Sequence, residues 1–278
     1  MSEGWMPNLL QFVPNMKIAN NYLREDIFLK NIFSYRKQEN KTTLSLIDNQ
    51  QDQLKFDNLE ARAVNLSILN RSCFISCYSV LRENFFDEKN QGKLRPEVIS
   101  GLEGGNIDDF GNPVSRPFIT ISSTRVEKLL NELKQSVDLY YKVHTIKAFN
   151  PKKGPFSTHN VEYLNLGDYL VEGLKLEDEY NMLLPKVLLL DGSSVLSVKN
   201  LNKCQKHIVR SLTKFFYCKK PKKFEVQNEY RFLAISEKPI DENLLENNFI
   251  KINLLTNLHS CIRVHDHDDI KNLKLSDL

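Results

Sequence analysis

The sequence predicts an α+β fold, in which helices flank a mixed and mostly antiparallel sheet. Strand-like and helix-like segments both occur along the chain, but they do not alternate in the regular way of a doubly wound parallel sheet. The 278 residues are 41% hydrophobic and 26% charged, which is an ordinary balance for a globular chain. Glycine and proline are scattered and no repeat or low-complexity linker is visible, so we expect one domain over residues 1–278.

The beginning of the chain predicts a helical N-terminal segment at about 1–40. Apolar residues recur there mostly at spacings of four or five, as on one face of a helix. The polar stretch 38–57 that follows predicts a loop with short elements. The apolar residues on which the helical prediction depends are Ile18, Tyr22, Ile27, Phe28, Ile32 and Phe33.

A strand is predicted over 72–80, where larger or apolar residues alternate with small polar ones over much of the run. Cys73 and Cys77 would then face the same side of the sheet as buried packing residues. The stretch 101–117 is rich in glycine and also contains two prolines, so it predicts a long irregular connection. Connections of this length are often functional or mobile.

The run 116–124 predicts a strand that ends in three hydroxyl residues at the start of a helix. Ser123 or Thr124 is placed to cap that helix, because the apolar residues after them keep helical spacing. A further strand is predicted over 139–146. Later in the chain we expect an amphipathic helix over 196–217 and strands over 229–235, 249–255 and 261–265.

Positive charge is concentrated in one segment of the chain. Residues 199–223 contain nine basic residues and no acid, while the rest of the chain has 29 basic residues against 35 acidic ones. Such a segment could bind a phosphate-bearing ligand, a nucleic acid or an acidic protein face, and the alternative is a solvated helix face followed by a basic turn. The bases singled out as candidate contacts are Lys206, Arg210, Lys214, Lys219, Lys220, Lys222 and Lys223.

Three features favour a cytoplasmic protein without a membrane partner. The five cysteines are an odd number and thinly spread, which indicates a reducing compartment rather than a disulfide framework. The longest apolar stretch, 182–190, is interrupted by a proline and a lysine, and it is shorter than the roughly 20 residues of a membrane crossing. The N-terminus lacks a basic start followed by an apolar core, so no secretory signal is predicted.

The triplet Gln227-Asn228-Glu229 stands at the start of a predicted strand, directly after the basic turn 219–223. It resembles the Gln/Glu-x-Glu motif of ADP-ribosyltransferases, which lies on a loop just before a core strand. The resemblance implies that the chain uses NAD, that Glu229 is the catalytic carboxylate and that Gln227 faces a protein or nucleic-acid acceptor. Cleavage of the bond between nicotinamide and ribose develops positive charge, which a fixed carboxylate that holds the ribose hydroxyl stabilises.

Two further elements extend this resemblance. The family's middle motif is an aromatic residue followed by Ser-Thr-Ser on a strand, and its nearest match is the run 118–124, so Ser122 is expected to line the cofactor cleft. In that family a basic residue on an early strand binds the dinucleotide. Arg62 and Arg71 precede the other two motifs in the order that the family has, so they are the candidates for this contact. The alternative to a transferase site is a plain edge turn that leads into a buried strand. In that case Arg231 is structural, and its guanidinium binds a neighbouring carboxylate through two hydrogen bonds.

A second resemblance covers more of the chain. It includes the strand at 75–79, the strand and helix that begin at 118, the stretch 141–143, and Lys222-Lys223-Phe224 leading into Asn228-Glu229-Tyr230-Arg231. This succession is similar to a widespread bacterial and phage domain family of unknown function, which usually ends such a segment in an acidic-Tyr-Arg strand. The resemblance implies a bacterial or phage protein with a role in host-defence conflict, and it implies no reaction.

The sequence thus leads to two hypotheses from different classes. The first is an ADP-ribosyltransferase-like protein that uses NAD, and the second is a non-enzymatic protein that binds nucleic acid or an acidic partner through 199–223. No Walker loop, nucleophile elbow or dinucleotide fingerprint is present in the sequence. His265, His267 and Asp269 alternate on an extended segment, but a solvated turn is the expected structure there, so no metal site is predicted.

Overall fold

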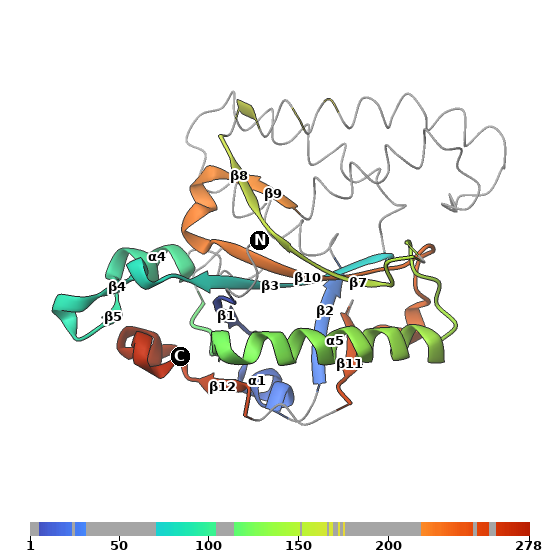
Figure 1. Ribbon diagram of the computed structural model, residues 1–278, viewed down its shortest axis with the longest axis horizontal. Helices are drawn as coiled ribbons and strands as arrows, with labels where there is room; N and C mark the ends of the chain where they lie inside the picture. Colours follow the sequence, from blue (N-terminus) through green and yellow to red (C-terminus); the bar gives the residue numbers. More distant parts are fainter. Residues whose placement is uncertain are drawn as a thin grey trace.

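An antiparallel sheet of eight strands occupies the centre of the computed structural model (Figure 1). The main strand order is β11-β2-β3-β1-β6-β12, and β10 continues the sheet from the opposite edge of β3 to β7. Helices pack beside this mostly antiparallel sheet, so the predicted α+β class is confirmed. The structure describes residues 6–23, 26–31, 71–103, 114–150, 152–165, 167, 168, 172, 175, 218–246, 249–255 and 260–278.

The strands of the central sheet are β1 (Asn8–Phe12), β2 (Asp26–Asn31), β3 (Cys73–Leu81), β6 (Phe118–Ile121), β7 (Phe156–Asn160), β10 (Glu229–Ile235), β11 (Phe249–Asn253) and β12 (Ile262–His265). Two small pairs lie outside it: β4 (Phe86–Asp87) with β5 (Lys93–Leu94), and β8 (Glu162–Leu164) with β9 (Lys219–Pro221). The α-helices are α1 (Met16–Leu23), α4 (Pro96–Glu103) and α5 (Ser123–Val143). The 3-10 helices are η2 (Glu83–Phe85), η3 (Glu88–Asn90), η5 (Lys222–Gln227), η6 (Glu242–Leu244), η7 (His267–Asn272) and η8 (Leu275–Asp277).

The N-terminal segment is not the continuous helix that its spacing predicts. Its residues form β1, α1 and β2 in succession, and only the part in α1 is helical among the described residues. β1 pairs with β3 on one edge and with β6 on the other, so strands that are distant in the chain decide its conformation. The predictions for residues 32–57 lie outside the described residues.

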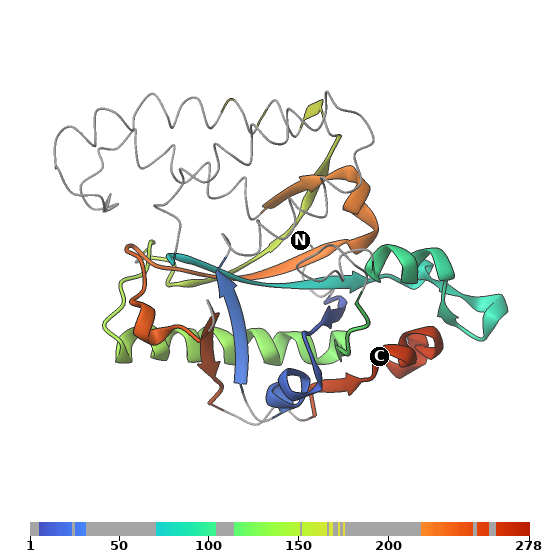
Figure 2. The same ribbon diagram turned by 180° about the vertical axis from the view of Figure 1, so that it is seen from behind.

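The strands predicted over 72–80 and 229–235 are confirmed as β3 and β10, which pair along most of their length. Their shared register sets the geometry of the centre of the molecule, because Arg231 lies opposite Cys77. Cys73 and Cys77 are buried on the same face of β3, as the alternation predicts. The opposite face of the two strands packs in the core that α5 covers (Figure 2).

The strand and helix predicted from 116 onward are confirmed as β6 and α5. The prediction of a strand over 139–146 is wrong, because α5 continues through Val143 and its buried residues recur at helical spacing as far as Tyr141. The predicted hydroxyl cap is also wrong. A side chain of β1 caps the helix instead, since the backbone N–H of Ser123 donates to Oδ1 of Asn8 at 2.7 Å.

The stretch predicted as an irregular connection over 101–117 begins as helix, because α4 extends to Glu103. Residues 104–113 lie outside the described residues. Gly101 of α4 lies directly against Val226 of η5, where a Cβ on Gly101 would collide with the valine side chain. This close approach holds η5 against α4 just before β10 begins.

The strands predicted near the C-terminus are confirmed as β11 and β12, which pair with β2 and β6. The helix predicted over 196–217 lies outside the described residues. Within the part of the chain that the structure describes, no helix is both long and apolar enough to cross a membrane.

Candidate functional site

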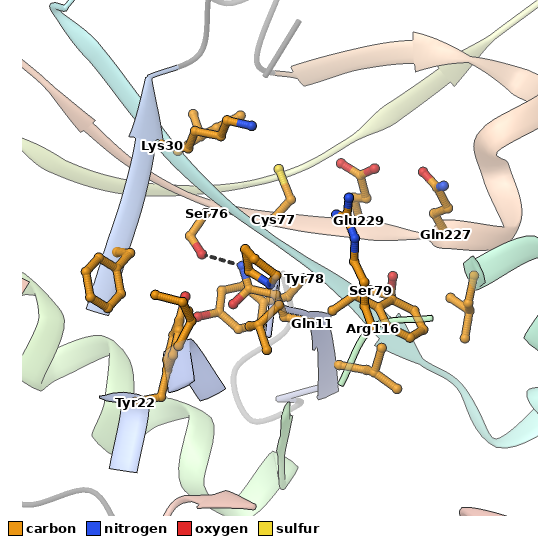
Figure 3. A pocket seen from close by; sticks show the side chains of 18 of the residues that line it. Gln11, Tyr22, Lys30, Ser76, Cys77, Tyr78, Ser79, Arg116, Gln227 and Glu229 are labelled. Atoms are coloured by element: carbon orange, nitrogen blue, oxygen red, sulfur yellow. Dashed lines mark hydrogen bonds between the residues drawn. The ribbon is translucent and has the colours of Figure 1, made fainter. Parts of the chain in front are cut away.

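The central sheet opens along one edge of β3. β10 pairs with β3 over residues 73–79, whereas the opposite edge of β3 is divided between two strands. β2 pairs with residues 74 and 75, and β1 pairs with residues 79–81. Among the described strands, none pairs with residues 76–78 on this edge, and a pocket of about 410 Å³ opens there (Figure 3).

The pocket has two chemically different ends because it reaches both faces of β3. Ser79 and Cys77 share a face with Glu229 and Arg231 of β10, by their register. Lys30 of β2, which lies opposite residue 75, flanks the gap on this same face. We call the end formed by Lys220, Gln227 and Glu229 the charged end.

The other end of the pocket lies toward the core that α5 covers. Its polar side chains belong to Gln11 of β1, Tyr22 of α1, and Ser76 and Tyr78 of β3. We call this set the neutral end, because none of these four residue types is ionised near neutral pH. The pocket therefore offers charge on one side of the sheet and uncharged polar groups on the other.

Glu229 is the centre of a buried ion cluster at the charged end. Nζ of Lys220 lies 2.5 Å from Oε1 of Glu229, and Nε and Nη2 of Arg231 each lie 2.8 Å from its Oε2. The exposed fractions are 4% for Lys220, 6% for Glu229 and 1% for Arg231. Two hydrogen-bonded cations thus fix both oxygens of one carboxylate in the protein interior.

Neighbouring groups hold this cluster in place. The backbone N–H of Glu229 donates to the hydroxyl of Tyr163 on β8 at 2.7 Å. Burial, and then the charge of Glu229, raise the pKa of Tyr163, so its phenol stays protonated. Lys220 also donates to Oε1 of Gln227 at 3.1 Å and lies over the ring of Phe224, 4.8 Å from its centroid.

Asn228 explains how the chain turns into β10 at this position. Its φ of 41° lies in the left-handed region, which asparagine tolerates better than most residues. Its Oδ1 accepts from Nη2 of Arg82 at 2.7 Å, and its Nδ2 donates to the carbonyl of Val80 at 3.3 Å. The middle residue of the triplet therefore ties the loop to β3, so that Gln227 and Glu229 both line the pocket.

The predicted cofactor contacts are not brought to Glu229. Arg71 lies before the opposite end of β3, has a φ of 59° and pairs with Glu242 at 2.8 Å. The hydroxyl of Ser122 lies 3.0 Å from that of Thr124 at the start of α5, and Ser122 does not line the pocket. Arg62 lies outside the described residues.

The described part of the basic segment does not form a continuous exposed surface. Nζ of Lys219 lies 2.8 Å from Glu172 and 3.4 Å from Glu162, and Lys220 is buried against Glu229, whereas Lys222 is exposed. The other predicted contacts, which are Lys206, Arg210, Lys214 and the side chain of Lys223, lie outside the described residues.

The histidines near the C-terminus make contacts with protein groups. Nε2 of His265 lies 2.8 Å from Oγ1 of Thr120, and its ring stacks on Phe118 with 4.7 Å between the centroids. Nε2 of His267 lies 3.5 Å from Oε1 of Glu103. In the described ranges, no group of three His, Cys, Asp or Glu side chains could hold a metal ion.

Several pocket residues were missed by reasoning from the sequence. Arg116 and Lys30 line the pocket, as do Gln11 and Tyr22. No local pattern distinguishes them, because the pocket depends on which strands separate from β3. The Glu229–Arg231 contact did carry a signal, since residues two apart on a strand share a face.

Comparison with known proteins does not add to this picture, because no family model, no curated protein and no solved structure matches the chain.

Proposed function

We propose that this chain is an NAD-dependent ADP-ribosyltransferase that binds the dinucleotide in the pocket beside β3 and modifies a protein or nucleic acid. The observation that supports this most is the position of Glu229, which brings a buried, ion-paired carboxylate to the pocket with Gln227 two residues before it. The pocket volume of about 410 Å³ lies in the range of about 300–1,000 Å³ that is typical of small-molecule sites.

Glu229 acts in this proposal by holding a ribose hydroxyl while nicotinamide leaves. The ribose then carries developing positive charge, which a nearby carboxylate stabilises. Such stabilisation is most effective when the charged group is already oriented, because no reorganisation is then needed during the reaction. The contacts from Lys220 and Arg231 supply that orientation.

The charges around the pocket suit a ligand that carries phosphate. The cluster of Lys220, Glu229 and Arg231 has one more positive than negative charge. Among the other lining residues, Lys30 and Arg116 add two cations and Glu246 adds one acid, so positive charge remains in excess. Arginine and lysine are the usual phosphate-binding side chains. A bound diphosphate would offset the positive excess, so that Glu229 can stabilise a cationic transition state.

Gln227 is the acceptor-facing residue of the proposal. It lines the charged end of the pocket, and Oε1 of its amide accepts a hydrogen bond from Lys220. Lys220 therefore links Gln227 and Glu229 through a single ammonium group. This link fixes the acceptor-facing amide relative to the carboxylate that holds the ribose.

The test compares wild type, Glu229→Gln and Glu225→Gln for nicotinamide release and for transfer of label from NAD to protein and nucleic-acid acceptors. Glu225 is an exposed acid of η5 that does not line the pocket, so its variant is a matched control. We expect turnover by wild type and Glu225→Gln, and a loss of about 100-fold or more in Glu229→Gln. Circular dichroism first establishes that each variant is folded. Equal turnover by folded Glu229→Gln, or no turnover by wild type with any acceptor, would contradict the proposal.

A further inference from the structure

Two buried polar atoms at the neutral end of the pocket have no hydrogen-bond partner within the described part of the chain. They are Oε1 of Gln11 and the hydroxyl of Tyr78. Buried polar groups in folded proteins are nearly always paired, so each unpaired group calls for an explanation. Both residues line the pocket beside β3, where a ligand could supply the missing partners.

The two atoms belong to neighbouring positions on paired strands. Leu10 of β1 lies opposite Ser79 of β3, and Gln11 and Tyr78 are the next residues along, directly after the paired register ends. Nε2 of Gln11 donates to Oγ of Ser76 at 2.9 Å, the contact drawn as a dashed line in Figure 3. That contact uses the nitrogen of the amide and leaves its oxygen as an acceptor.

Tyr78 is held as a hydrogen-bond donor. Its exposed fraction is 1%, and its ring packs against Phe232 with 4.5 Å between the centroids. Burial raises the pKa of Tyr78 well above its usual value, so the hydroxyl keeps its proton. The neutral end therefore presents one acceptor, Oε1 of Gln11, and one donor, the hydroxyl of Tyr78.

Aromatic rings form a wall on the β2 side of the pocket. The ring centroids of Tyr22 and Phe28 are 6.2 Å apart, and those of Phe28 and Phe249 are 6.4 Å apart with the rings nearly perpendicular. All three residues line the pocket. A flat ring bound in the pocket could contact such rings stacked or edge to face, the two geometries that aromatic pairs prefer.

We propose that the neutral end of the pocket recognises the edge of a planar heterocycle that presents an N–H donor beside an acceptor atom. The N–H donates a hydrogen bond to Oε1 of Gln11, and the acceptor atom accepts a hydrogen bond from the hydroxyl of Tyr78. The inference rests on the proposed function in naming the carboxamide of nicotinamide as the first source of this edge. The base of a purine nucleoside is the second source. A carboxylic acid in the same place would set an oxygen against Oε1 of Gln11, so the neutral end disfavours it.

The experiment titrates the full chain with nicotinamide, nicotinic acid and adenosine by ligand-observed NMR. It uses wild type, Tyr78→Phe, Gln11→Met and the control Tyr141→Phe. Tyr141 also has a buried hydroxyl without a partner among the described residues, but it does not line this pocket. We expect Tyr78→Phe and Gln11→Met to weaken binding of nicotinamide or adenosine by about tenfold, as for the loss of one hydrogen bond. Tyr141→Phe keeps the wild-type affinity, and nicotinic acid binds more weakly than nicotinamide.

Thermal unfolding without ligand separates recognition from a structural role. Because no described group meets hydrogen-bond geometry with the hydroxyl of Tyr78, Tyr78→Phe should unfold at about the wild-type temperature or above it. Affinity lost at unchanged stability supports the inference, whichever of the two compounds binds. Equal affinity of wild type and Tyr78→Phe, or failure of both compounds to bind wild type, overturns it.

The two proposals fail separately. Nicotinamide release that depends on Glu229 but not on Tyr78 overturns the inference and leaves the proposed function intact. Binding that depends on Tyr78, without any turnover of NAD, overturns the proposed function and leaves the inference intact.

Discussion

Nζ of Lys220 lies 2.5 Å from Oε1 of Glu229, and both side chains are buried. Lys220 belongs to β9 and Glu229 to β10, so this contact joins the small parallel pair of strands to the central sheet. A buried ion depends on its partner, because an unpaired charge in the interior bears an uncompensated desolvation cost. The same contact therefore stabilises the fold and fixes the orientation of a carboxylate that lines the pocket.

Replacing Glu229 with Gln is expected to destabilise the protein by about 3–5 kcal/mol, because it leaves two buried cations without their carboxylate. The double variant Lys220→Met/Glu229→Gln should recover part of this loss, since it removes one of those cations. Urea unfolding of wild type, the single variant and the double variant measures both effects. A double variant that is less stable than Glu229→Gln alone would contradict this interpretation of the pair.

Replacing Gly101 with Ala is expected to lower the free energy of unfolding by about 1–3 kcal/mol, because the new Cβ collides with Val226. Val226→Ala removes the colliding atoms, so the double variant should be more stable than the sum of the two single effects predicts. A double-mutant cycle by urea unfolding measures this coupling. Additive effects would show that α4 and η5 do not depend on this contact.

Cys73 is expected to be unreactive in the folded protein. Burial raises the pKa of its thiol to about 12, so almost no thiolate is present at pH 8. Native protein treated with iodoacetamide at that pH should remain unmodified at Cys73, and protein unfolded in urea should be modified there. Peptide mass spectrometry gives the extent of modification in each sample. Rapid labelling of Cys73 in the native state would contradict its burial.

Stability is expected to fall as the pH decreases below about 6.5, the ordinary pKa of histidine. Burial, and then the neighbouring Arg263, lower the pKa of His265 in the folded protein. The unfolded chain therefore binds a proton at a higher pH than the folded one, which favours unfolding in this range. His265→Gln should show a smaller loss of stability between pH 7 and pH 5 by urea unfolding. An identical loss in both proteins would assign the pH dependence to other groups.

The parts of the fold that could be predicted are those whose pattern is local. β10 follows from the apolar run after Glu229, and α5 follows from apolar residues at helical spacing after a hydroxyl-rich turn. The N-terminal segment could not be predicted in this way. Its apolar spacing resembles that of a helix, whereas pairing with β3 and β6, about 70 and 110 residues further along the chain, makes β1 a strand.

In the candidate site, too, only the residues that belong to a local pattern could be predicted. Glu229 and Gln227 could be singled out because a short motif carries them. Lys220 stands in a run of bases that predicts a solvated surface, and its actual partner lies on a different strand. The gap beside residues 76–78 of β3 depends on the separation of β1 from β2, which no sequence period encodes.

The most direct measurement of the proposed function is the rate of nicotinamide release from NAD by wild type, Lys220→Met and Lys220→Met/Glu229→Gln. The last variant removes the carboxylate without leaving both cations unpaired, so its folded state can be compared with that of its parent. The proposal predicts release by wild type, slower but measurable release by Lys220→Met, which keeps only the Arg231 contact to Glu229, and a further loss of about 100-fold or more when Glu229 is replaced in that background. The same rate with and without Glu229, in folded protein, would contradict it.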